Sequence, residues 1–193
     1  IILVSCYPKP KGEDFVKALG ELNGQVTKDI DERVDYLAHN SSNKKIVYRA
    51  DLLEKFYDGR KSTSAWSNTG IFSASADSLF RFVKNIEDCG LNKQDYFSAR
   101  LDTVFDLLTR DTTQRLNAAL WSEGDVLLTD AFIKICDHLH YGRLPLDTIS
   151  LRKENMYDEQ TILDLLNKSL SKKNISSLLT AVEPHWGQYH LLK

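Results

Sequence analysis

Cysteine and histidine side chains in the segment 125–144 have a spacing that could support nucleophilic chemistry. Cys136 and His140 are four residues apart, so in a helix they would lie on one face, where a thiol and an imidazole could act as nucleophile and base. Cys136 also lies at the edge of an apolar stripe, and no oxyanion loop is evident nearby. The pattern therefore favours a small buried cysteine, and we expect no catalytic residue in this chain.

Histidine residues are also the candidate metal ligands. His138 and His140 are two residues apart, and His185 and His190 are five residues apart. These spacings match no structural zinc signature. We therefore expect neither a metal ion nor a cofactor.

Several carboxylates lie near one another in the sequence, as acid–base hydrolysis of a glycosidic bond would require. Helix caps and solvated helix faces account for the same residues without any chemistry. A small hydrolase that uses them is one hypothesis. The carboxylates are Asp102, Asp106, Glu123, Asp125 and Asp130.

The apolar residues around these side chains have the periodicity of an amphipathic helix. Leu128, Phe132, Ile135 and Leu139 recur at positions i, i+4, i+7 and i+11, as in a helix that packs one face against a core. We therefore expect Phe132, Ile135 and Leu139 to be buried.

Both ends of this helix have sequence signals. Ser122, followed three residues later by Asp125, has the form of a capping box. At the other end, Gly142 favours a left-handed stop, Arg143 suits the negative end of the helix, and Pro145 prevents continuation. The pattern predicts a helix that starts near Ser122 and stops at Gly142.

Helical spacing recurs along the chain and predicts a mainly α fold, a compact multi-helix bundle with little or no β-strand. Gly90 ends one helix and Asn92 starts the next, which favours a helical hairpin. At most a short strand is expected near Ile46–Arg49, and Trp66 in the polar loop 61–70 is expected to fill an edge of the core. Other expected helical segments are 15–22, 26–37, 52–57, 76–86, 96–108, 111–120 with a break or kink near Gly124, 162–166 and 175–182.

Composition excludes several classes of protein. The 193 residues are 42% hydrophobic, which permits one domain or two small ones with roughly 70% of the unfolded surface buried. The net charge of -2 is spread along the chain without a basic stripe, so we expect no nucleic-acid partner. No apolar run approaches the roughly 20 residues that span a bilayer. Cys89 and Cys136 lack CxxC spacing, and we expect two buried reduced thiols, with a disulfide between them as the alternative.

The first residues resemble the end of a bacterial lipoprotein signal sequence, in which an aliphatic residue and small residues precede a lipidated cysteine. Leu3, Val4, Ser5 and Cys6 fit this lipobox pattern. The resemblance implies lipidation of Cys6 and anchoring to a membrane through the lipid. The alternative is a short first strand over residues 1–5.

Several motifs occur in a defined order along most of the chain. In order and spacing they resemble the N-terminal scaffold domain of the large murein L,D-transpeptidases, enzymes that cross-link the bacterial cell wall. The motifs are LLTDAF at 127–132 followed by YGR at 141–143, FY..R....AW at 56–66, a Gly90-Leu91 turn before Asp95-Tyr96, and a weaker match at 179–189.

This resemblance implies a noncatalytic scaffold region that positions a downstream cysteine transpeptidase domain on peptidoglycan. The family's S-x-G-C-x-R nucleophile motif does not occur in the chain, so the natural protein is expected to continue past Lys193. The expected location is the bacterial cell envelope or periplasm. The alternative is a stand-alone helical envelope adaptor or glycan-binding protein, and the third hypothesis is a small peptidoglycan hydrolase that uses the carboxylates named above.

Domain boundaries follow from the same observations. Residues 1–12 contain the signal remnant and a tether made extended by its prolines. Residues 13–193 form the helical scaffold domain, in which 13–45 match the family poorly and 46–193 match it.

Polar residues near both ends of the LLTDAF helix have two interpretations. Thr129 and Asp130 fit local capping and hydrogen bonds between helices. Tyr141 and Arg143 fit the same local role, or an aromatic and charged interface with the catalytic domain.

Overall fold

The computed structural model describes residues 12–40, 46–142, 158–172 and 175–183. Within these ranges the chain forms seven α-helices and one two-stranded sheet, so the expected mainly α fold is confirmed. The helices are α1 (Gly12–His39), α2 (Ala50–Gly59), α3 (Ala74–Lys84), α4 (Ser98–Arg110), α5 (Ala118–Tyr141), α6 (Glu159–Leu170) and α7 (Ser176–Thr180).

The small sheet is an antiparallel hairpin of β1 (Ser67–Asn68) and β2 (Ile71–Phe72). It lies after α2, whereas the sequence suggested a strand near Ile46–Arg49. That strand was the most that the sequence allowed, and none forms there: residues 46–48 form a turn and a bend, and the N–H of Tyr48 donates to the side chain of Asp130 instead of to a neighbouring strand.

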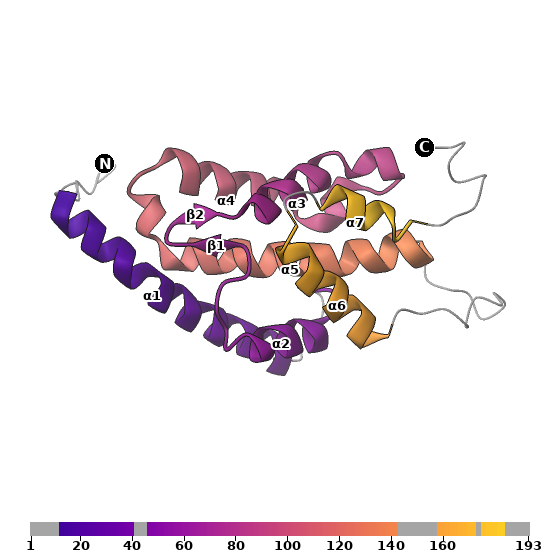
Figure 1. Cartoon of the computed structure of the whole chain (residues 1–193), viewed down its shortest axis with the longest axis horizontal. Coiled ribbons are helices and arrows are strands. Elements are labelled where there is room, and N and C mark those ends of the chain that lie inside the picture. The colour runs from indigo at the N-terminus through magenta and orange to yellow at the C-terminus, as the bar shows by residue number, and fades with distance from the viewer. Residues whose placement is uncertain (1–11, 41–45, 143–157, 173–174, 184–193) are drawn as a thin grey trace, which may run out of the picture.

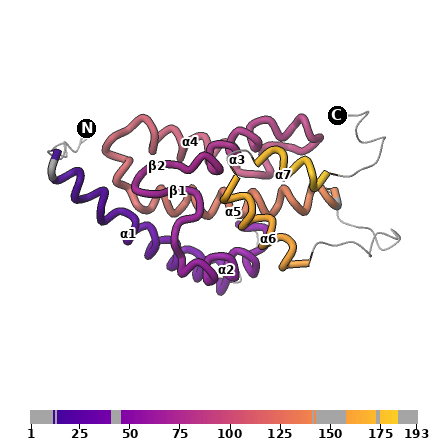
Figure 2. The backbone as a smooth tube through the Cα atoms, in the orientation of Figure 1, coloured from indigo at the N-terminus to yellow at the C-terminus, as the bar shows by residue number. Residues whose placement is uncertain are grey.

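Helix α5 is the central element of the molecule. Each of the other α-helices in the described ranges contacts it, and Figures 1 and 2 show α5 running between α4 on one side and α1 on the other. Phe132, Ile135 and Leu139 are buried as predicted, but so are Val126 and Ile133 on the opposite side of the helix. The expected amphipathic helix is therefore buried on nearly all sides, through polar as well as apolar residues, because it is surrounded by other helices.

The start of α5 differs from the sequence prediction. Asn117 is its N-cap, and the Asn117 side chain accepts a hydrogen bond from the N–H of Leu120. Ser122 lies inside the helix, where its hydroxyl donates to a backbone carbonyl one turn earlier. Before Asn117, only the short 3-10 helix η4 (Gln114–Leu116) stands where a helix over 111–120 was expected.

The helix continues through Gly124 without the expected break. A Cβ atom at Gly124 would lie 3.1 Å from a side-chain methyl of Val104 on α4, so this glycine permits close packing of α4 on α5. Gly142, with a φ of 84°, ends the helix as predicted.

The N-terminal helix α1 is one continuous element of 28 residues, although the sequence suggested two helices separated near Gly24. A glycine inside a helix costs about 1 kcal/mol relative to alanine. Val26, Ile30 and Val34 are buried, and α1 packs along α5. This burial stabilises the helix enough to retain the glycine.

Helices α3 and α4 form the expected helical hairpin. Gly90, with a φ of 72°, follows the 3-10 helix η2 (Ile86–Cys89), and the side chain of Asn92 caps the 3-10 helix η3 (Lys93–Tyr96). Phe97 has a φ of 56°, a conformation that separates η3 from α4. As a result α4 begins at residue 98, two residues later than expected.

Candidate functional site

Asp125, in the first half of α5, is a carboxylate in the interior of the molecule. It accepts hydrogen bonds from the Tyr57 hydroxyl at 2.7 Å, from the Ser64 hydroxyl, and from the backbone N–H groups of Ala65 and Trp66, both at 2.9 Å. Tyr57 belongs to α2, and the other donors belong to the loop after α2. Asp125 therefore fixes α2 and this loop to α5.

Thr129, one helical turn after Asp125, extends this network. Its Oγ1 accepts a hydrogen bond from the Trp66 indole N–H at 2.9 Å and lies 2.8 Å from the Tyr57 hydroxyl. Trp66 is fully buried, which confirms that it fills the core. Tyr57, Ser64, Trp66, Asp125 and Thr129 are called the Asp125 cluster below. A buried network with its polar groups satisfied is rigid and specifies one arrangement of the chain.

Burial also controls the protonation of this cluster. Burial raises the pKa of the Asp125 carboxyl, and the hydrogen bonds from Ala65, Ser64, Trp66 and Tyr57 oppose that rise. Burial, followed by the charge of Asp125, raises the pKa of Tyr57 well above its ordinary value. Tyr57 is therefore a neutral hydroxyl that donates to the carboxylate.

Asp130 holds the other end of α2. Its Oδ1 accepts a hydrogen bond from the N–H of Tyr48 at 2.7 Å. Tyr48 lies one residue before Arg49, the N-cap residue of α2, which makes no side-chain capping bond of its own. Asp130 therefore fixes to α5 the segment that leads into α2. Together, Asp125 and Asp130 clamp α2 at both ends.

Lys134 lies beside Asp130, between two aromatic rings. Its ammonium is 5.8 Å from the centroid of the Tyr48 ring and 5.7 Å from that of Tyr96, and it donates to the carbonyl of Asp95 at 2.8 Å. These distances are typical of cation–π contacts. Lys134 therefore links α5 to the segments before α2 and before α4.

Two further α5 residues complete this region. The Tyr96 hydroxyl and the Nδ1 atom of His138 share a hydrogen bond of 2.7 Å. Burial, followed by the charge of Asp137 and a hydrogen bond to it, raises the pKa of Tyr48 to about 12. The residues around Asp130 thus form one contact region: Tyr48, Tyr96, Asp130, Lys134, Asp137 and His138.

The pH dependence of stability gives a direct test of the Asp130 environment. Burial raises the pKa of Asp130 from 3.8 to about 6, although the Tyr48 N–H and the Lys134 charge oppose the rise. The folded state therefore binds this proton more tightly than the unfolded state, and stability decreases as the pH rises from about 4 to about 6. Between these limits the Asp130 carboxyl is expected to remove up to about 3 kcal/mol from the free energy of unfolding.

Urea unfolding of the wild type and of Asp130→Asn at a series of pH values measures this contribution. Asparagine does not titrate, so we expect the variant to gain stability relative to the wild type as the pH rises through this window. The difference between the two proteins cancels the titration of other carboxyls. Parallel pH profiles would show that Asp130 titrates normally in the folded protein.

The thiol of Cys136, which we considered as a nucleophile beside His140, is not accessible. Cys136 is buried in α5, and burial raises the pKa of its thiol far above the ordinary value. A buried neutral thiol is a poor nucleophile. Cys136 and Cys89 form no disulfide, as expected. The expected burial is right for Cys136, but Cys89 is half-buried.

The five carboxylates considered for hydrolysis do not converge on one cleft. Asp102, Asp106 and Glu123 each form an ion pair with a basic residue nearer the surface. Asp125 and Asp130 are buried and accept hydrogen bonds from the backbone. The predicted capping and surface roles account for them, except that Asp125 and Asp130 act across the fold and not on their own helix.

Several candidate residues lie beyond the described ranges. Cys6, Arg143, His185 and His190 are outside them, and Tyr141 is described only as the last residue of the α5 backbone. Within the described ranges, no three His, Cys, Asp or Glu side chains are grouped as a metal ion would need. No helix in that part of the chain is long and apolar enough to cross a membrane.

Two of the sequence motifs meet inside the Asp125 cluster. Tyr57 and Trp66, from the FY..R....AW segment, both contact Thr129 of the LLTDAF segment. A family model described as "Scaffold domain" matches residues 51–193.

The chain belongs to the Scaffold domain family.

The matched part of this Scaffold domain begins at the second residue of α2 and includes every described helix after it. Helix α1 lies before the matched part. Searches of the curated proteins and of the solved structures give no match.

We singled out Asp125, Thr129 and Asp130 from the sequence but did not predict their hydrogen-bond partners. The signal was the presence of three polar residues within an otherwise apolar run, because such residues in a buried helix need hydrogen-bond partners. Their partners are 59 to 82 residues away in the sequence, so local patterns did not identify them.

Proposed function

We propose that this Scaffold domain is the noncatalytic scaffold region of a bacterial cell-wall L,D-transpeptidase, which positions a downstream cysteine transpeptidase domain on peptidoglycan. The observation that supports the proposal is that residues of the resembling motifs build the buried clamp of α2 on α5. Tyr57, Trp66, Thr129 and Asp130 all take part in it. The envelope location and the lipid anchor at Cys6 belong to the same proposal.

Positioning is the mechanism that suits this geometry. A module that holds a catalytic domain near its substrate raises the effective concentration of the reacting groups without supplying any of them. The scaffold must then be rigid, and the two buried carboxylates of α5 restrain α2 and its flanking segments. We place the contact with the catalytic domain at the end of α5, where Tyr141 and Arg143 follow one another closely in the sequence.

Cross-linking by the protein expressed from its complete reading frame tests this function. We expect that protein to form cross-linked muropeptides, detected by liquid chromatography and mass spectrometry, and the 193-residue chain to form none. Tyr57→Phe removes one hydroxyl from the Asp125 cluster. In the complete protein it is expected to slow cross-linking roughly tenfold through misplacement of the catalytic domain, without loss of thiol labelling at the catalytic cysteine.

Tyr36→Phe is the matched control, because Tyr36 is an exposed tyrosine of α1. Equal cross-linking rates in the wild type and in both variants would contradict rigid positioning. A complete reading frame without a cysteine transpeptidase motif would favour the stand-alone adaptor. Muropeptide cleavage by the 193-residue chain that is lost in a carboxylate variant would favour the hydrolase.

A further inference from the structure

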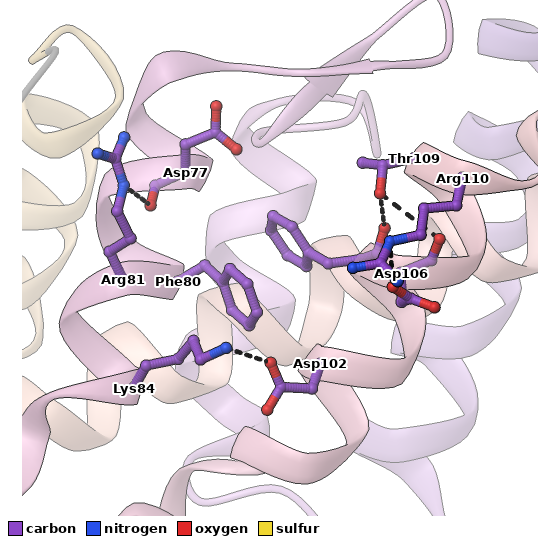
Figure 3. Close-up of a pocket in the computed structure, with 9 residues that line it drawn as sticks. Asp77, Phe80, Arg81, Lys84, Asp102, Asp106, Thr109 and Arg110 are labelled. Atoms are coloured by element: carbon purple, nitrogen blue, oxygen red, sulfur yellow. Dashed lines mark hydrogen bonds and ion pairs between the residues drawn. The ribbon is translucent and has the colours of Figure 1, made fainter.

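Helices α3 and α4 enclose a surface groove of about 420 Å³. Figure 3 shows Asp77 and Arg81 on one wall, Asp106 and Arg110 on the other, and Phe80 between them. Ligand pockets in proteins commonly measure about 300 to 1,000 Å³. The groove is therefore large enough for a few residues of an extended peptide.

A row of stacked aromatic rings supports the floor of the groove. The Phe80 ring stacks on Phe105 with centroids 4.0 Å apart, and Phe105 stacks on Phe72 at 3.9 Å. Phe72 also packs against Trp121 at 4.6 Å. Rings held in this way present an apolar surface that loses little conformational freedom when a ligand covers it.

Charged groups of both signs line the walls. Lys84 and Asp102 close one end of the groove with an ion pair of 2.9 Å. On α3, the Arg81 Nε donates to the Asp77 carbonyl at 3.2 Å. Among the described residues, the other nitrogens of Arg81 and the carboxylate of Asp77 make no hydrogen bond or ion pair. Because they are four residues apart, these two groups offer opposite charges on one helix face.

A second cavity of about 250 Å³ shares Asp77 and Thr109 with the groove, so the two hollows adjoin. It leads toward Arg115, whose Nε donates to the Gly70 carbonyl at 2.9 Å. The exposed side chain of Ile71 also lines this cavity. The combined surface is mixed in character, with the Phe80 and Phe72 rings lying among cations and carboxylates.

The charges that line the groove limit the kinds of ligand that can bind there. Lys84 pairs with Asp102 and Arg110 pairs with Asp106, so the groups left for a ligand are the Asp77 carboxylate and the Arg81 guanidinium. A nucleic acid or another polyanion would meet the Asp77 carboxylate, and an apolar helix would bury these two charges without partners. A chain that carries both carboxylate and ammonium groups can match both signs while its apolar parts cover Phe80.

We propose that the groove between α3 and α4 binds an extended peptide that carries both carboxylate and ammonium groups, as the stem peptides of peptidoglycan do. The choice of a stem peptide rests on the proposed function. The groove then holds the substrate strand directly, in addition to the positioning of the catalytic domain.

Nuclear magnetic resonance titration of the 193-residue chain tests the groove. The probe is a soluble disaccharide tripeptide that ends in diaminopimelate, a residue with a free ammonium and a free carboxylate. We expect saturable shifts in α3, α4 and the β1–β2 hairpin. Arg81→Glu is expected to weaken binding at least about fivefold, because one exposed charge contact contributes up to about this factor and the reversal adds repulsion.

Lys17→Glu is the matched control, since Lys17 is an exposed lysine of α1 outside the groove. It should leave the affinity unchanged. The disaccharide without its peptide, and the tripeptide with its free amine acetylated, should both bind more weakly than the intact probe. Shifts elsewhere, equal binding of the bare disaccharide, or equal losses in the two variants would overturn the inference.

The same titration separates this inference from the proposed function. If the complete protein has no transpeptidase domain but an unrelated peptide of alternating Glu and Lys residues binds the groove, only the choice of a stem peptide fails. If the complete protein cross-links muropeptides but Arg81→Glu binds the probe like the wild type, only the groove inference fails.

Discussion

Replacing Asp125 with alanine is expected to lower the free energy of unfolding by about 3 to 5 kcal/mol, because several buried donors lose their shared acceptor and each such loss costs about 1 to 3 kcal/mol. The substitution leaves the Tyr57 and Ser64 hydroxyls and two backbone N–H groups of the loop after α2 without their acceptor. Each buried donor left without a partner is destabilising. Chemical denaturation at neutral pH measures the loss.

Asp102→Ala is the control for the loss of a carboxylate at the surface. Asp102 forms an exposed ion pair with Lys84, and such pairs contribute at most about 1 kcal/mol. Asp125→Asn keeps the shape but replaces one acceptor by a donor that faces other donors, so it should also be clearly destabilising. A loss for Asp125→Ala no larger than that for Asp102→Ala would show that the cluster does not hold the loop.

Phe132→Ala is expected to cost roughly 3 to 5 kcal/mol, because it removes buried apolar surface and leaves a cavity. Phe132 is fully buried in the central helix α5, with its ring centroid 6.4 Å from that of Trp66. The cavity would open beside the Asp125 cluster and would be difficult to close, since Trp66 is held by its own hydrogen bonds. Urea unfolding gives the magnitude.

Phe132→Leu retains most of the side-chain volume and should cost less than the alanine variant. If Phe132→Ala changed the free energy of unfolding by only about 0.5 kcal/mol, as many surface substitutions do, the central place of α5 would be wrong.

Local sequence patterns predicted most of the helices because the spacing of apolar residues and the end signals act over a few residues. The apolar positions of α2 and the stop at Gly142 are as predicted. The errors occur where packing overrides a local preference. Gly24 and Gly124 suggested helix breaks, but both lie inside continuous helices that pack against their neighbours.

The capping box at Ser122 shows the limit of such patterns. Ser122 and Asp125 have the residue types of a helix start, and Asn117 five residues earlier is also a capping residue. Only the packing of the whole chain directs the Asp125 carboxylate to the loop after α2, and Asn117 then begins the helix. A side chain with several possible local roles takes the one that satisfies buried donors elsewhere.

By itself, the sequence determined the helical class, the burial of Phe132 and the family motifs, because each depends on residue type and short spacing. The tertiary structure alone decided that Asp125 and Asp130 clamp the two ends of α2, and that opposite charges from α3 and α4 line one groove. These features join residues far apart in the chain. Which donor meets which carboxylate depends on how the helices pack, and that arrangement is a property of the whole fold.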